Sequence, residues 1–142
     1  MMNYRMKSER WLTEYESVKN INVKSSSFQP YLNQKFMIWK MRREHALFCM
    51  DRTGSGKTLG SILSSKDQKA QFTLVVCPYN IMIQWMGEIR TAYPDSTITT
   101  EYDVNKNVNP TCTNTGSHYH VVNYEKFSQD NRKSKGLIDA LK

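Results

Sequence analysis

The sequence predicts an α/β fold in which a parallel β-sheet carries helices on both faces. Apolar runs of strand length alternate along the chain with segments of helical periodicity, which is the order expected of consecutive βαβ units. The run at residues 74–77 also lacks any polar alternation, as expected of a strand that is covered on both sides. With 142 residues, the chain fits one domain or part of one.

The N-terminal region contains two helical patterns. Residues 1–27 are polar and mixed in charge, and they predict an arm or a short helix within residues 9–20. A serine-rich linker ends at Pro30, and residues 28–142 are predicted to form the folded lobe. Residues 31–45 open that lobe with an amphipathic helix whose last turns carry Lys and Arg.

The rest of the lobe alternates strands and helices. Apolar runs and β-branched residues predict four strands, at residues 46–50, 72–77 and 96–102 and within 118–127. Helical patterns begin at residue 58 and cover residues 81–93 and 136–142. The helix at residues 81–93 is expected to draw its apolar surface from a set of five residues. These are Ile81, Ile83, Trp85, Ile89 and Tyr93.

Composition narrows the class of partner. Twenty Lys and Arg against 13 Asp and Glu give a net charge of +7, which favours polyanions such as nucleic acid, although a solvated basic surface explains it equally well. The odd set of Cys49, Cys77 and Cys112 fits no disulfide framework and predicts buried thiols in a reducing compartment. With no apolar run of about 18 residues, a soluble cytoplasmic protein is expected. His118 and His120 would share one face of a strand, but an evident ligand set for zinc is lacking.

The most specific pattern is TGSGKT, at residues 53–58. Gly54 and Gly56 allow tight backbone conformations that carry N–H groups inward, and these donors suit an anion at the start of the following helix. Lys57 would reach the β- and γ-phosphates of a nucleotide, and the Thr58 hydroxyl would bind Mg²⁺. The strict phosphate-loop pattern asks for glycine at position 51, where this chain has Asp51.

Four stretches together carry a resemblance to a known family. They are PYLNQ (residues 30–34), FCMDRTGSGKTLG (48–60), TLVVCPYNIMIQWMGEI (73–89) and HVVNYEKF (120–127). In order and spacing they resemble the glutamine motif and motifs I, Ia and Ib of superfamily 2 helicases. The resemblance is closest to the SWI/SNF-type DNA translocases, including those common in phages. It implies a RecA-like lobe that binds ATP and Mg²⁺.

The resemblance also implies roles for individual residues. Gln34 would recognise the adenine edge, and an ordinary glutamine on the helix surface is the alternative. Lys57 and Thr58 would be the catalytic residues of the loop. The residues implied in ATP binding are Gln34, Thr53, Gly54, Ser55, Gly56, Lys57 and Thr58. The resemblance also implies residues that bind nucleic acid, with DNA favoured over RNA and the choice between them left open. These are Pro78, Tyr79, Asn80, Asn123 and Tyr124.

One part of the family's machinery is not found. The acidic motif that polarises the attacking water contains an Asp-Glu pair, and this sequence has none. We therefore expect an incomplete lobe that binds nucleotide without turnover and that works with the remainder of a motor, namely the acidic segment and a second lobe. A non-catalytic binding module or a truncated regulatory remnant is the alternative. A GTPase is disfavoured because no Asn-Lys-x-Asp motif occurs.

Overall fold

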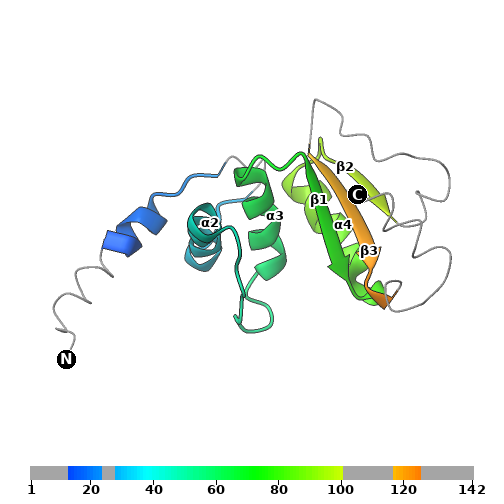
Figure 1. Cartoon of the computed structure of the whole chain (residues 1–142), viewed down its shortest axis with the longest axis horizontal. Helices are drawn as coiled ribbons and strands as arrows, with labels where there is room; N and C mark the ends of the chain where they lie inside the picture. The colour runs from blue at the N-terminus through cyan, green and yellow to red at the C-terminus, as the bar shows by residue number, and fades with distance from the viewer. Residues whose placement is uncertain (1–12, 24–27, 101–116, 126–142) are drawn as a thin grey trace. The chain divides into compact units, whose positions relative to one another are not determined.

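The computed structural model describes residues 13–23, 28–100 and 117–125 (Figure 1). These residues fall into two compact units, one ending at Gln68 and the other beginning at Lys69. The predicted helix at residues 136–142 and Cys112 lie outside the described residues. Within the part that is described, no helix is long and apolar enough to cross a membrane.

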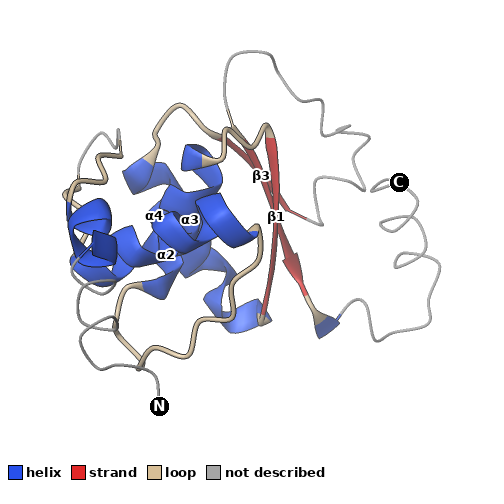
Figure 2. Cartoon of the chain, turned by 60° about the vertical axis from the view of Figure 1, so that its left-hand side comes forward, coloured by secondary structure: helices blue, strands red, loops and turns tan. Residues whose placement is uncertain are grey.

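The first unit is helical. Residues 13–19 form a short helix within the predicted N-terminal arm. Helix α2 spans Leu32–Glu44 and helix α3 spans Lys57–Asp67, which confirms both predicted helices (Figure 2). Ile38 of α2 and Ile62 and Leu63 of α3 are buried, and each such side chain contributes about 1.5–3 kcal/mol of hydrophobic stabilisation.

A close approach and an ion pair hold α2 against α3. Gly60 lies so near α2 that a β-carbon added there would stand 2.6 Å from the sulfur of Met37. Towards the C-terminal ends, the guanidinium of Arg42 donates to both carboxylate oxygens of Asp67, at 2.8 and 2.6 Å. The hydrogen bond to Asp67 raises the pKa of Arg42 above its ordinary value. Helices α2 and α3 therefore pack directly against each other, and the loop at residues 45–56 connects them.

The predicted strand at residues 46–50 is wrong. This segment is extended but belongs to no strand, and Phe48 and Met50 are 85% and 83% exposed. The physical reason is that no described strand lies beside residues 46–50 to pair with them, and an extended segment becomes a strand only by such pairing. The sheet that the described residues form is built from other segments.

The second unit is a parallel sheet with a helix. Strands β1 (Phe72–Cys77), β2 (Thr97–Thr100) and β3 (His118–Asn123) lie in the order β1-β3-β2, and both pairings are parallel. This confirms the predicted α/β class with an all-parallel open sheet. Central strand β3 is buried along its whole length. The expectation that residues 74–77 are covered on both sides is wrong, because β1 alternates, with Val75 and Cys77 buried and Val76 50% exposed. Among the described residues β1 is an edge strand, and one of its faces is left uncovered.

Helix α4 (Met82–Ala92) follows β1 through a short 3-10 turn at Tyr79–Ile81 and packs against β3. The helix is confirmed, but its predicted apolar face is wrong in one place, because Ile83 is 84% exposed. At about 100° per residue, position 83 lies some 200° from position 85 and faces the opposite side. The buried positions of α4 are Met82, Ile89 and Ala92.

Candidate functional site

The loop before α3 has the backbone that its glycines predict. Gly54 and Gly56 have φ angles of +81° and +78°, a left-handed region that glycine adopts without strain. Gly56 is the N-cap residue of α3, and its carbonyl oxygen accepts the first helical hydrogen bond, from the N–H of Gly60 at 3.0 Å. The backbone N–H groups at the start of α3 therefore point out of the helix and into the loop region.

Lys57 places its ammonium group against the first half of the loop. Its Nζ donates to the carbonyl oxygens of Asp51 and Arg52, at 2.7 and 2.8 Å. These bonds keep the cation at the loop although both acceptors are neutral. A bound phosphate would compete with these carbonyls for the ammonium group. Its hydrogen bond to Lys57 would be stronger, because the phosphate is negatively charged and the carbonyls are neutral.

Gln34 lies beneath the loop. The side chain is 2% exposed, so it is no ordinary surface glutamine. Its Oε1 accepts from the N–H of Tyr31 at 2.9 Å, and its Nε2 donates to the carbonyl oxygen of Gly56 at 3.1 Å. Both ends of the amide thus bond to the protein's own backbone, and its predicted contact with adenine stays a prediction.

Asn33 is a residue of this site that the sequence did not single out. Its Nδ2 donates to the carbonyl oxygen of Ser55, at 2.7 Å. Two consecutive residues of α2 therefore bond two consecutive carbonyls of the loop, across 22 residues of sequence. No local pattern marks such a contact, because an amide in the first turn of a helix is common for reasons of helix capping alone.

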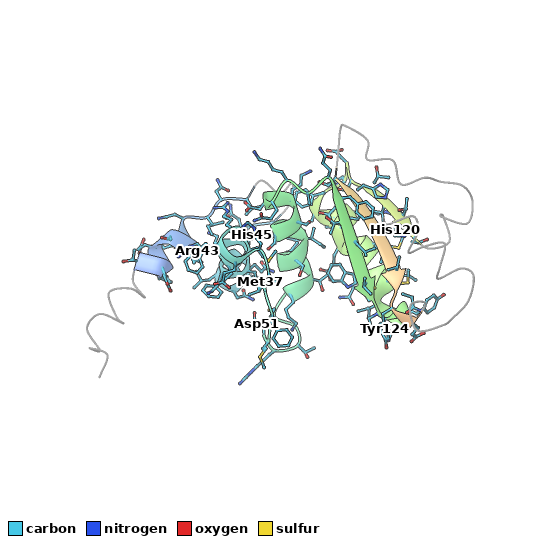
Figure 3. All side chains as sticks on the ribbon, in the orientation of Figure 1. Met37, Arg43, His45, Asp51, His120 and Tyr124 are labelled. Atoms are coloured by element: carbon cyan, nitrogen blue, oxygen red, sulfur yellow. The ribbon has the colours of Figure 1, made fainter. Side chains whose placement is uncertain are left out.

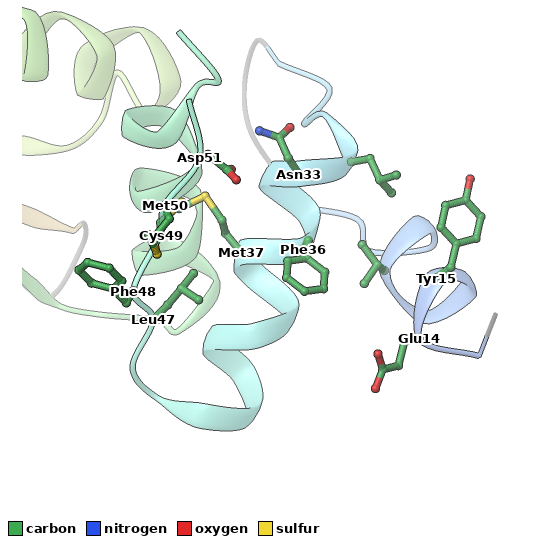
Figure 4. Close-up of a pocket in the computed structure, with 12 residues that line it drawn as sticks. Glu14, Tyr15, Asn33, Phe36, Met37, Leu47, Phe48, Cys49, Met50 and Asp51 are labelled. Atoms are coloured by element: carbon green, nitrogen blue, oxygen red, sulfur yellow. The ribbon is translucent and has the colours of Figure 1, made fainter. Parts of the chain in front are cut away.

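A pocket of about 450 Å³ lies beside this loop and within the first unit (Figure 4). Its walls come from the helix at residues 13–19, from α2 and from the extended segment that leads into the loop. Most of its lining is apolar, and Asn33 and Asp51 add polar groups where it adjoins the loop. The lining residues are Glu14, Tyr15, Val18, Leu32, Asn33, Phe36, Met37, Leu47, Phe48, Cys49, Met50 and Asp51.

The second unit brings two predicted site segments together. Strands β1 and β3 are adjacent and in register from Phe72↔His118 to Cys77↔Asn123, so both end at the same edge of the sheet. The N–H of Tyr124 donates to the carbonyl oxygen of Cys77, at 3.1 Å. Figure 3 shows Tyr124 just beyond the end of β3. Pro78, Tyr79 and Asn80 therefore begin beside Asn123 and Tyr124.

The side chains at this edge differ in what they offer. Tyr79 and Tyr124 are 59% and 50% exposed. Asn123 is buried, and its Oδ1 accepts from the N–H of Glu125 at 2.9 Å, which holds the turn after β3. The edge therefore presents two tyrosine rings to solvent, while Asn123 shapes the backbone that carries one of them.

The two histidines share a hydroxyl group inside the sheet. Thr99 Oγ1 lies 2.8 Å from His118 Nε2 and 2.8 Å from His120 Nδ1, and all three residues are buried. The ring of Phe72 stacks on both imidazoles. Burial lowers the pKa of His118 below its ordinary value. Among the described residues, no group of three or more His, Cys, Asp or Glu side chains is arranged to hold a metal ion.

The SNF2-related domain matches residues 11–136, which is most of the chain. The chain belongs to the SNF2-related domain family. Residues 53–58 and the two strand ends lie within the matched region, and membership of this helicase-like family implies interaction with nucleic acid in general. No curated protein gives a significant match to the chain.

Proposed function

We propose that this SNF2-related domain binds Mg²⁺-ATP at residues 53–58, as the ATP-binding part of a superfamily 2 DNA translocase. The observation that carries the proposal is the loop itself, where two left-handed glycines precede a helix that begins with Lys57 and Thr58. Backbone N–H groups and an ammonium group suit the phosphates, and a threonine hydroxyl suits the Mg²⁺ ion. The proposed ATP-binding residues are Thr53, Gly54, Ser55, Gly56, Lys57 and Thr58.

We propose that the pocket beside the loop binds the nucleoside part of ATP. It is largely apolar and of a size suited to a small ligand, and Asn33 and Asp51 connect it to the loop. In this proposal the base enters the pocket while the phosphates reach the N-terminus of α3. The magnesium ion would neutralise phosphate charge there, and Lys57 would add its own charge.

Turnover is not part of the proposal for this chain alone. Attack by water needs a carboxylate that positions it, and the sequence contains no Asp-Glu pair. Hydrolysis would then require the acidic motif from elsewhere in the motor. We therefore expect saturable binding of ATP without release of phosphate.

We propose that DNA contacts the edge where β1 and β3 end. The support is the pair of exposed tyrosines, Tyr79 and Tyr124, at one edge of a parallel sheet, where ligands of α/β folds gather. The net charge of +7 favours a polyanion. Replacing both tyrosines by alanine should weaken binding of a DNA oligonucleotide measured by anisotropy, whereas Ile83→Ala, on the exposed side of α4, should not.

A thermal shift experiment tests the nucleotide proposal. Mg²⁺-ATP in large excess should raise the melting temperature of the wild-type chain, because a ligand that binds only the folded state stabilises it. Lys57→Ala should lose most of the shift. Lys69→Asn is the matched control, since it also removes one positive charge and asparagine tolerates the left-handed backbone of that position. An equal shift in all three proteins would contradict the proposal.

A further inference from the structure

The contact between α2 and the loop acts on the orientation of two peptide groups. The carbonyl of Ser55 belongs to the same peptide unit as the N–H of Gly56, and the carbonyl of Gly56 belongs with the N–H of Lys57. In a trans peptide the C=O and N–H bonds point in opposite directions. Asn33 holds the first carbonyl at 2.7 Å and Gln34 holds the second at 3.1 Å. Both N–H groups must therefore point away from α2.

The second of these peptide groups is fixed from two sides. The carbonyl oxygen of Gly56 accepts from Gln34 and also from the N–H of Gly60, at 3.0 Å. Gln34 is itself held by the N–H of Tyr31 and buried, so it has little freedom to turn. The peptide group between Ser55 and Gly56 is held differently. From α2 and α3, its carbonyl oxygen accepts a hydrogen bond from Asn33 alone.

Contacts between α2 and α3 fix the position of α2 relative to the loop. Arg42 and Asp67 join the far ends of α2 and α3, and Gly60 lets the two helices approach closely. A β-carbon at Gly56 would collide with Nε2 of Gln34, so the loop and α2 are in direct contact at this point. The contact between α2 and the loop is therefore made by both Asn33 and Gln34.

We propose that Asn33 is a positioning residue for phosphate binding, which acts by turning the N–H of Gly56 toward the bound anion while Gln34 does the same for the N–H of Lys57. The inference rests on the proposed function, since it assumes that residues 53–58 bind a triphosphate. Asn33 need not touch the ligand's phosphates. Its effect passes through the peptide group between Ser55 and Gly56.

The test uses the full chain, inorganic triphosphate with Mg²⁺ as the probe, and the amide NMR signals of Gly56 and Lys57 as the readout. Asn33→Leu keeps nearly the size of the side chain and adds no charge, but it removes the donor. Asn33→Ala is the second variant, in case leucine disturbs folding. Gln68→Glu is a variant whose binding should not change, because an 11-residue helix, about 16 Å long, separates it from the loop.

In the wild-type chain the amide signals of Gly56 and Lys57 should shift on titration with triphosphate. In the Asn33 variants the Gly56 signal should be displaced already without ligand, and the affinity should fall about 3- to 10-fold, the effect of one net hydrogen bond. Wild-type affinity and an undisplaced Gly56 signal in both Asn33 variants would overturn this inference and leave the proposed function standing. If the amide signals of the wild-type chain do not shift on addition of triphosphate, both the proposed function and this inference are overturned.

Discussion

Gln34 donates its side-chain N–H to the carbonyl oxygen of Gly56 at 3.1 Å, across a separation of 22 residues. The bond brings the first turn of α2 directly under the loop that precedes α3. It also leaves no room at Gly56 for a side chain, because a β-carbon there would meet Nε2 of Gln34. Glycine is therefore required at position 56 for two reasons. The backbone there is left-handed, and the side chain of Gln34 occupies the space that a β-carbon would need.

Comparing Gly54 with Gly56 separates the cost of the left-handed backbone from the cost of the contact with Gln34. Both have positive φ, but a β-carbon at Gly54 has no neighbour within 4 Å. Gly54→Ala should lower the free energy of unfolding by about 1 kcal/mol, the cost of the left-handed backbone alone. Gly56→Ala should lower it by about 2–4 kcal/mol, because overpacking adds to that cost. Urea unfolding followed by circular dichroism measures both, and equal losses would contradict the contact with Gln34.

Gly60 and Gly87 form a second pair, in the interiors of α3 and α4. Gly87→Ala should raise the free energy of unfolding by about 0.5–1 kcal/mol, because alanine favours the helix and nothing lies within 4 Å of its β-carbon. Gly60→Ala should lower it by about 1–2 kcal/mol, since its β-carbon would lie 2.6 Å from the sulfur of Met37. If both variants were stabilised alike under thermal unfolding, the close packing of α3 on α2 would be wrong.

The pair of Arg42 and Asp67 should contribute modestly to stability. The Arg42 side chain is 46% exposed, so solvent screens the ion pair, but its two parallel hydrogen bonds favour arginine over lysine. A double-mutant cycle with Arg42→Gln and Asp67→Asn should give a coupling energy of about 0.5–1 kcal/mol in low salt, because each substitution alone removes the ion pair. The coupling should shrink in 1 M NaCl. A coupling of zero at both salt concentrations would show that this contact does not hold α2 to α3.

The buried imidazole of His118 should make the sheet sensitive to acid. Burial lowers the pKa of His118 below its ordinary value of 6.5, so the folded state resists protonation. As the pH falls below about 6.5, the unfolded chain takes up a proton that the folded chain does not, and the free energy of unfolding decreases. The loss continues until the pH reaches the lower pKa of the folded state.

His118→Gln tests this pH dependence, because glutamine keeps a polar side chain and cannot take up a proton. Urea unfolding of both proteins between pH 5 and 8 should show a shallower decline for the variant below pH 6.5. The difference between the two curves, and not either curve alone, reports His118, since carboxylates contribute to both. Parallel curves would mean that His118 binds protons equally in the folded and unfolded chains.

The sequence predicts the local elements of this protein well, because helices and buried strands carry their periodicity in short stretches. Helices α2, α3 and α4 and strand β1 were all found from such patterns, and residues 53–58 were found from a motif whose glycines have a direct backbone cause. The alternation of strands with helices also predicts the parallel arrangement. The apolar run of β1 is misleading, since one face of that strand is exposed.

What the sequence could not predict depends on partners far along the chain. Residues 46–50 look like a strand, but an extended segment needs a neighbour to pair with, and composition does not reveal whether one is present. The contacts of Asn33 and Gln34 with the loop join positions 22 residues apart, and neither residue differs in type from a surface amide. The burial of two histidines on one threonine hydroxyl likewise depends on the register of β2 with β3.

Nucleotide binding at residues 53–58 is best tested by titrating the wild-type chain and Lys57→Ala with a fluorescent ATP analogue in the presence of Mg²⁺. We expect saturable binding by the wild-type chain. In Lys57→Ala the affinity should fall about tenfold or more, because the charge-assisted bonds of Lys57 are lost. Circular dichroism of both proteins before the titration establishes that each is folded. Binding of equal strength in the two folded proteins, or none in the folded wild-type chain, would contradict nucleotide binding at residues 53–58.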